Sequence, residues 1–147
     1  MSDNPAIESQ ITPIKIAYSG PKLIVTVDTE EAFNWSAPMT TSHHSVNSPE
    51  DIAPFQKICA DAGVNPLYFI SWPILKNPAM REYFKSLRDA NAADTGLHLH
   101  QWVTPPLTSN LDIAASFQTN LPDDLHLQKL HALAAVSYTH LTLPTKA

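Results

Sequence analysis

Apolar residues are spaced in two different ways along this chain. Three short runs are rich in apolar, β-branched or aromatic residues, which is typical of strands. These runs are KLIVTV (22–27), NPLYFISW (65–72) and TGLHLHQW (95–102). The first run has the continuous apolar character of a strand that is buried on both faces, as in parallel sheets, and it ends at Asp28.

A helix is predicted after the first run, beyond a polar stretch at 34–48 that has no periodicity and indicates a long surface loop. In SPEDIAPFQKICADAG, Ser48 is a suitable N-cap and Pro49 suits the first helical position. Pro54 leaves open a later start at Ala53, because its ring removes a hydrogen bond inside a helix.

Two further helices are predicted, from NPAMREYFKSLRDAN and from NLPDDLHLQKLHALAA. The residues expected to face inward on the last helix are Leu127, Leu130, Leu133 and Ala134. Strands and helices therefore alternate, which favours a parallel α/β sheet or barrel with right-handed crossovers. In such folds the chemistry gathers at the carboxyl ends of the strands.

The composition is that of a globular protein with one domain. The chain has 147 residues, 44% of them hydrophobic, and a formal net charge of −5. This acidic balance disfavours nucleic acid and anionic membranes as partners, since both attract clustered Lys and Arg. No apolar run approaches the ~20 residues of a membrane span, and the polar N-terminus is unlike a secretory signal, so we expect a cytoplasmic location.

The single cysteine, Cys59, excludes a disulfide within the chain. It falls on the apolar side of the first predicted helix. This position indicates a small buried side chain rather than a nucleophile.

Acidic residues and histidines are expected to meet at one rim of the predicted sheet. Asp28 and Glu30 share a face, because alternate side chains of an extended chain point the same way. His98 and His100, in the last half of the third predicted strand, share a face for the same reason. One carboxylate and two imidazoles, with a position left for water, is the usual make-up of a catalytic Zn²⁺ site. A second carboxylate beside the metal could act as general base.

Each half of this pattern also has a simpler explanation. An acidic cluster after a strand is usually a solvated loop or a helix N-terminus. A histidine pair on a strand is less common, because a polar side chain inside a parallel sheet needs a partner. The two halves together, at the same end of the sheet, favour a site.

At these residues the chain resembles the polysaccharide deacetylase superfamily, the NodB-homology domain of carbohydrate esterase family 4, and within it the WalW-like subgroup. The resemblance rests on LIVTVDTEEAFNW, GVNPLYFISWPIL and TGLHLHQWVTPPL, and it covers roughly residues 20–135. It implies a deformed (β/α) barrel, a divalent metal that is usually zinc, and hydrolysis of an N-acetyl or related non-peptide amide on a polysaccharide or glycan.

The resemblance also implies roles for individual residues. Asp28 stands where the family has its catalytic base, and Glu30 where a related subgroup has its metal carboxylate. His98 matches the first histidine of the second motif. The chain departs from the family at two places: Thr29 separates acids that are usually adjacent, so Glu31 is a second candidate ligand, and Trp102 takes the place of the usual second histidine.

His100 is the nearby substitute for that second histidine, and we expect it to be a metal ligand. Trp35 and Trp102 flank the rim and could stack on sugar faces, although packing in the core is an equal alternative for both. No residue matches the histidine that usually serves as general acid.

The family domain usually exceeds 200 residues, so we expect an N-terminal fragment: a partial (β/α) barrel of about three β-α units at 21–135, after a lead-in at 1–20. The stretch VSYTHLTLPTKA at 136–147 breaks the preceding pattern and is interpreted as a non-native tail. A fragment of this kind is expected to be inactive alone.

Two rival functions stay open. One is another metal amidohydrolase, which the third-strand position of the His-x-His pair disfavours. The other is a non-catalytic glycan-binding or regulatory relative, motivated by Trp102. Substrate identity and oligomeric state are not indicated by the sequence.

Overall fold

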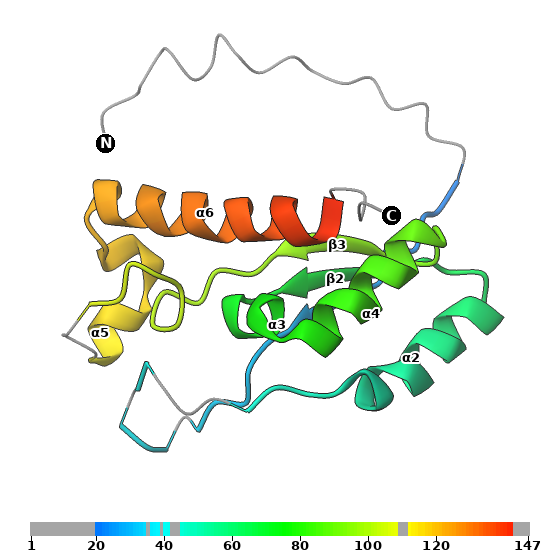
Figure 1. The fold of residues 1–147 in the computed structure, drawn as a ribbon, viewed down its shortest axis with the longest axis horizontal. Coiled ribbons are helices and arrows are strands. Elements are labelled where there is room, and N and C mark those ends of the chain that lie inside the picture. The colour runs from blue at the N-terminus through cyan, green and yellow to red at the C-terminus, as the bar shows by residue number, and fades with distance from the viewer. Residues whose placement is uncertain (1–19, 35, 39, 42–44, 109–111, 143–147) are drawn as a thin grey trace, which may run out of the picture.

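The computed structural model describes residues 20–142 except 35, 39, 42–44 and 109–111 (Figure 1). Its centre is a parallel sheet of three strands in the order β1-β2-β3. The strands are β1 (Thr26–Thr29), β2 (Leu67–Ile70) and β3 (Asp94–Leu97). Asp28 pairs with Phe69, which pairs with Gly96. The predicted parallel α/β arrangement is therefore confirmed as a small sheet, which is compatible with part of a larger α/β fold.

Helices connect the strands and continue after the last one. They are α2 (Pro49–Asp61), α3 (Trp72–Lys76), α4 (Pro78–Asp89), α5 (Ile113–Ser116) and α6 (Asp123–Ser137). Two short turns of other helix types complete the described chain: a 3₁₀ turn η1 (Gln118–Asn120) and a π-helical turn η2 (Tyr138–Thr142). None of the described helices has both the length and the apolar character needed to span a bilayer.

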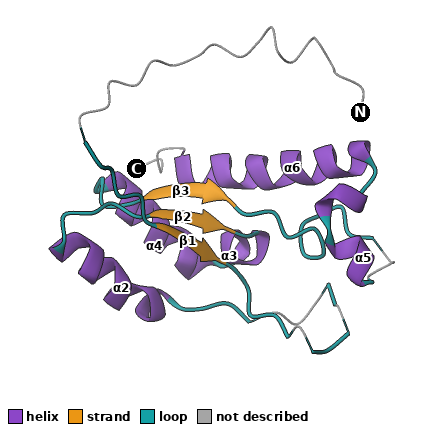
Figure 2. Cartoon of the chain, turned by 180° about the vertical axis from the view of Figure 1, so that it is seen from behind, coloured by secondary structure: helices purple, strands orange, loops and turns teal. Residues whose placement is uncertain are grey.

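The hydrophobic core lies between the sheet and the helices on one of its faces. Tyr68 and Ile70 point into it from β2. They meet buried residues of the surrounding helices, namely Ile52, Ile74, Leu75, Met80, Phe84 and Leu133. Figure 2, drawn from behind, shows the strands in front of α3 and α4, with no described helix lying across them on that side. The sheet of the described chain is thus covered on one face only.

This one-sided cover overturns the prediction that the first strand is buried on both faces. β1 begins at Thr26, and Leu23 and Ile24 before it are 75% and 76% exposed. Thr26 and Asp28, alternate residues of β1, are exposed, because no described helix covers the face of the sheet to which they point. Asp28 lies inside β1 rather than after it.

The predicted start of the first helix at Pro49 is confirmed, and the later start at Ala53 is wrong. The Asp51 carboxylate accepts hydrogen bonds from the backbone N–H of Ser48, at 2.8 Å, and from its hydroxyl, at 3.0 Å. Pro54 is accommodated within the helix, on an exposed position. Cys59 is buried, as expected.

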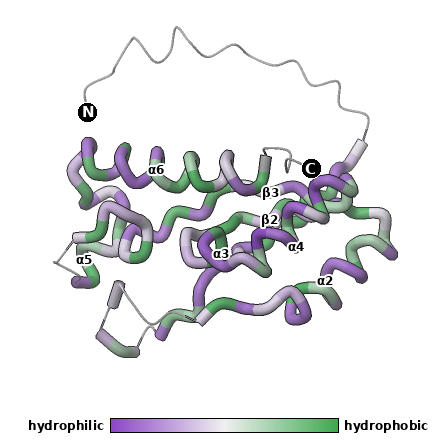
Figure 3. The backbone as a smooth tube through the Cα atoms, in the orientation of Figure 1, coloured by the Kyte–Doolittle hydropathy of each residue, from purple (hydrophilic) through white to green (hydrophobic). Residues whose placement is uncertain are grey.

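The prediction for the inward face of the last helix is confirmed at Leu133 and wrong at the other three positions. Leu127, Leu130 and Ala134 are exposed, and the fully buried residues of α6 are Lys129 and Leu133. Figure 3 shows why the sequence is ambiguous here, since hydrophobic and hydrophilic positions alternate along α6 without forming two clean stripes. The buried lysine decides the rotation, because its ammonium group donates to three backbone carbonyls, those of Gln101, Thr104 and Pro106.

The third strand is shorter than predicted. It ends at Leu97, so His98 and His100 lie just beyond β3 and not in its last half. His98 still donates its backbone N–H to the carbonyl of Ile70, at 3.0 Å. The chain then turns, with the N–H of Thr104 bonded to the carbonyl of His100, at 3.0 Å, and this turn ends the strand geometry.

The first half of the segment interpreted as a non-native tail is folded against α4. Leu141 is 2% exposed within the core, and its carbonyl accepts a hydrogen bond from Arg88, at 2.9 Å. The origin of this segment stays a prediction.

Candidate metal centre

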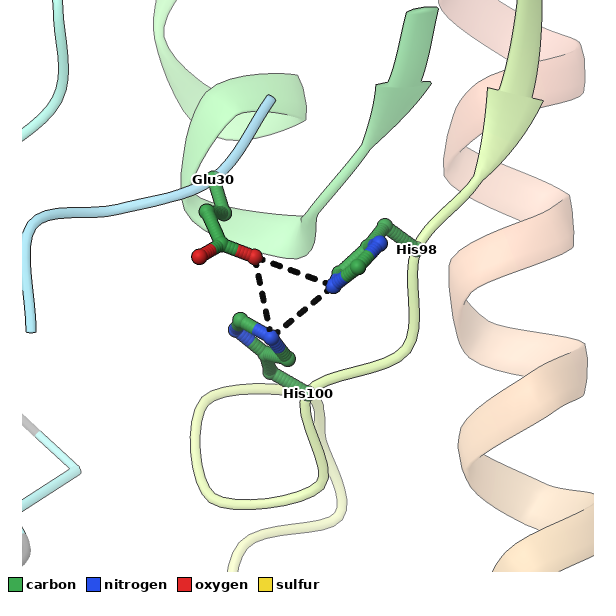
Figure 4. A group of neighbouring side chains, drawn as sticks. All are labelled: Glu30, His98 and His100. Atoms are coloured by element: carbon green, nitrogen blue, oxygen red, sulfur yellow. Dashed lines mark hydrogen bonds and ion pairs between the residues drawn. The ribbon is translucent and has the colours of Figure 1, made fainter. Parts of the chain in front are cut away.

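The acidic residues and the histidines meet at the carboxyl edge of the sheet, as the sequence predicts. Glu30 and Glu31 follow β1 directly, and His98 and His100 follow β3. Because the strands are parallel, their carboxyl ends lie at the same edge, with β2 between them. Figure 4 shows the Glu30, His98 and His100 side chains pointing toward a common centre.

Three ligand atoms form a nearly equilateral triangle at this edge. The Nε2 atoms of His98 and His100 are 2.9 Å apart. Glu30 Oε2 lies 3.0 Å from Nε2 of His98 and 3.2 Å from Nε2 of His100. Within the described residues, this is the group of side chains able to hold a metal ion.

The triangle is close to the size expected for a metal ion with tetrahedral coordination. Zinc bonds of about 2.0–2.1 Å put neighbouring ligand atoms about 3.3 Å apart in tetrahedral geometry. The observed separations of 2.9, 3.0 and 3.2 Å are slightly shorter. Two borderline nitrogen donors and one carboxylate oxygen are also a donor set that zinc and its neighbours in the first transition row accept. The residues present therefore fit a divalent transition metal.

Glu31 approaches His100 from the opposite side of the imidazole ring. Its Oε1 lies 2.8 Å from Nδ1 of His100, and its Oε2 accepts a hydrogen bond from the Ser71 hydroxyl, at 2.9 Å. Burial acts to raise the pKa of Glu31, but hydrogen bonds from His100, its own backbone and Ser71, together with the electrostatic interaction with His100, outweigh it and hold that pKa below the usual value. Glu31 is thus a buried carboxylate that contacts the candidate ligand His100 and lies outside the triangle.

Asp28 lies on the other side of His98. Its Oδ1 is 3.6 Å from Nδ1 of His98, beyond hydrogen-bond distance, and its side chain is 64% exposed. This carboxylate borders the site and retains free acceptor capacity toward solvent.

Aromatic side chains pack against the His100 ring. Trp102 is 5% exposed and stacks on the His100 ring, with centroids 4.3 Å apart and planes 21° apart. The Phe33 ring packs in turn against Trp102, and the centroids of these two rings are 5.2 Å apart. Trp102 thus packs against the candidate ligand His100. Trp35, the other predicted sugar-binding residue, lies outside the described residues.

A cavity of about 640 Å³ opens beside the triangle. Asp28, His98, His100 and Trp102 line it, together with residues that the sequence pattern did not single out, namely Phe69, Leu97, Leu99, Ser116, Phe117 and Gln118. The last three come from the irregular segment around α5 and η1, held in place by a hydrogen bond from Gln118 to the carbonyl of Leu99, at 2.8 Å. No periodicity marks such a segment as part of a site.

Comparisons of this chain with protein-family models, with curated proteins and with solved structures gave no match.

Proposed function

We propose that this chain is part of a metal-dependent hydrolase that removes N-acetyl or related amide groups from a carbohydrate, similar to the polysaccharide deacetylases. We further propose that its β-α units belong to a (β/α) barrel. One observation carries the proposal: a carboxylate and two imidazoles converge within 3.2 Å of one another, beside an exposed carboxylate and a cavity.

Glu30, His98 and His100 would hold the cation. When bound, the metal would polarise the acyl oxygen and lower the pKa of a coordinated water towards neutrality. Asp28 is the candidate general base, because its carboxylate is exposed on the cavity wall next to the ligands and can take up a proton there.

The hydrophobic surroundings contribute to the same chemistry. Trp102 stacks on one face of the His100 ring, and Phe33 packs against Trp102. This aromatic packing shields that face of His100 from water, so the imidazole would interact with a bound cation in a less polar environment. The cavity beside Phe69 and Phe117 offers apolar surface for an acyl group or a sugar face.

Metal analysis of the purified full chain is the direct test. We expect about one divalent ion per chain, with zinc the favoured metal, and loss of that ion in His98→Ala. Asp94→Asn is the matched control, because Asp94 lies at the opposite end of β3. Absence of divalent metal binding in the wild-type protein would overturn the proposal.

Asp28→Asn separates the two possible roles of this carboxylate. If Asp28 is the general base, the variant keeps the metal, and any release of acetate from N-acetylated oligosaccharides by the wild type is lost. If Asp28 instead orients His98, the variant also loses metal affinity.

A further inference from the structure

We propose that Glu31 is a positioning residue that fixes His100 in the tautomer required of a metal ligand. The inference rests on the proposed metal site and deepens it. It assigns a role to a carboxylate that the sequence offered only as an alternative ligand.

The first step of the argument is the burial of the carboxylate. The Glu31 side chain is fully buried, with 0% exposure, and a buried carboxylate is costly unless it is paired and hydrogen-bonded. Its two oxygens have separate partners, His100 Nδ1 at 2.8 Å and the hydroxyl of Ser71 at 2.9 Å. Ser71 is itself fully buried, with 0% exposure. The position of the Glu31 carboxylate is thus fixed through both of its oxygens.

The second step concerns the proton on the imidazole. An ionised carboxylate only accepts hydrogen bonds, so the short contact with Glu31 requires a hydrogen on Nδ1 of His100. In the neutral ring the other nitrogen, Nε2, then carries the lone pair. Nε2 is the atom that faces Glu30 and His98. Glu31 thus directs the lone pair of His100 into the ligand triangle.

The third step is a comparison of the two histidines. His98 has a carboxylate near its Nδ1 as well, but the distance to Asp28 Oδ1 is 3.6 Å and Asp28 is 64% exposed. His100 is therefore the candidate ligand whose Nδ1 has a buried partner within hydrogen-bond distance, and His98 lacks such a partner at its Nδ1. Carboxylates that orient ligand histidines raise metal affinity by 10- to 100-fold in other sites.

The test uses Glu31→Gln in the full chain, with Zn²⁺ affinity measured by competition with a chelator. Glutamine keeps the size of the side chain and removes its charge. We expect binding to be weaker by roughly 10- to 100-fold. Glu50→Gln is the matched control, since Glu50 is exposed in the first turn of α2, and it should bind Zn²⁺ as the wild type does. In a His100→Ala background, the same Glu31 change should have no further effect on Zn²⁺ affinity.

A second readout needs no metal. Nitrogen NMR of the metal-free wild type should show His100 protonated at Nδ1, and Glu31→Gln should give a mixture of tautomers. Ser71→Ala, which leaves Oε1 of Glu31 on His100, should keep the wild-type tautomer even if Glu31→Gln folds poorly.

The outcomes distinguish the two proposals. Wild-type protein that binds no Zn²⁺ but shows the Nδ1 tautomer overturns the metal function and leaves the hydrogen bond in place. Wild-type Zn²⁺ affinity in folded Glu31→Gln, or His100 protonated at Nε2 in the metal-free wild type, overturns the role of Glu31.

Discussion

At Gly96 the absence of a side chain determines how the open face of the sheet is packed. A Cβ atom at this position would lie 2.7 Å from Cδ1 and 2.8 Å from Cε1 of Phe69, the residue paired with Gly96 on β2. The Phe69 ring therefore lies across Gly96, and Phe69 also lines the cavity beside His98. Glycine allows this ring to reach the wall of the site.

Gly96→Ala is expected to lower the free energy of unfolding by about 1–3 kcal/mol, because the ring must move away from its place. Urea denaturation measures this change. In Gly96→Ala combined with Phe69→Leu, the smaller side chain relieves the clash, so the two effects should not add. Full additivity would show that the ring and the new methyl group do not collide.

At the scale of single elements, α6 shows how a helix can turn an unexpected face to the core. Leu133 is fully buried, whereas Leu130, three residues earlier, is 37% exposed. The helix is oriented by Lys129, which needs the backbone carbonyls of the loop after His100, and Leu133 follows it one turn later on the same face.

The two leucines should therefore respond differently to truncation. Leu133→Ala is expected to cost about 2–5 kcal/mol of unfolding free energy through cavity formation. Leu130→Ala should cost much less, because its side chain already contacts solvent. Thermal or urea unfolding of the pair checks this, and equal losses would contradict the orientation of α6.

At the N-terminus of α2, the contribution of Asp51 to the stability of the fold is expected to depend on pH. The pKa of Asp51 is lowered by hydrogen bonds from the backbone and then the side chain of Ser48. A carboxyl with a lowered folded-state pKa stabilises the fold above its unfolded pKa, about 3.8–3.9, and loses this contribution as pH falls through the folded value. The stability difference between the wild type and Asp51→Ala should thus be constant near neutral pH and shrink below pH ~4. Denaturation curves between pH 7 and pH 3 measure it, and a difference that grows on acidification would contradict the capping role.

At the scale of the whole molecule, Lys129 ties the helical layer to the loop that carries the candidate ligands. Its ammonium group is 2.9 Å from the carbonyl of Gln101 and 2.7 Å from that of Thr104, and the side chain is fully buried. Burial lowers the pKa of this lysine, and the carbonyls compensate by accepting its hydrogens. The loop begins at His100, so the anchoring of α6 and the geometry of the site are linked.

Lys129→Met is expected to destabilise the protein by roughly 2–5 kcal/mol, because it leaves buried carbonyls without a donor. It should also weaken Zn²⁺ binding, since His100 lies at the start of the loop. Lys57→Met is the control, because the Lys57 side chain is 74% exposed and its ion pair with Asp61 lies on the surface of α2. Unchanged stability in Lys129→Met would show that water replaces the ammonium group.

The sequence by itself determined the alternation of strands and helices and the meeting of Glu30 with His98 and His100. These features depend on local spacing and on the rule that parallel strands place their carboxyl ends together. Only the tertiary structure decided the extent of β1 and β3, the inward face of α6, and the pairing of Glu31 with His100. The physical reason is that these features depend on contacts between segments far apart in the sequence, which no local pattern encodes. One face of the strands is covered by helices, Lys129 donates to carbonyls of a distant loop, and Glu31 contacts His100, 69 positions further along the chain.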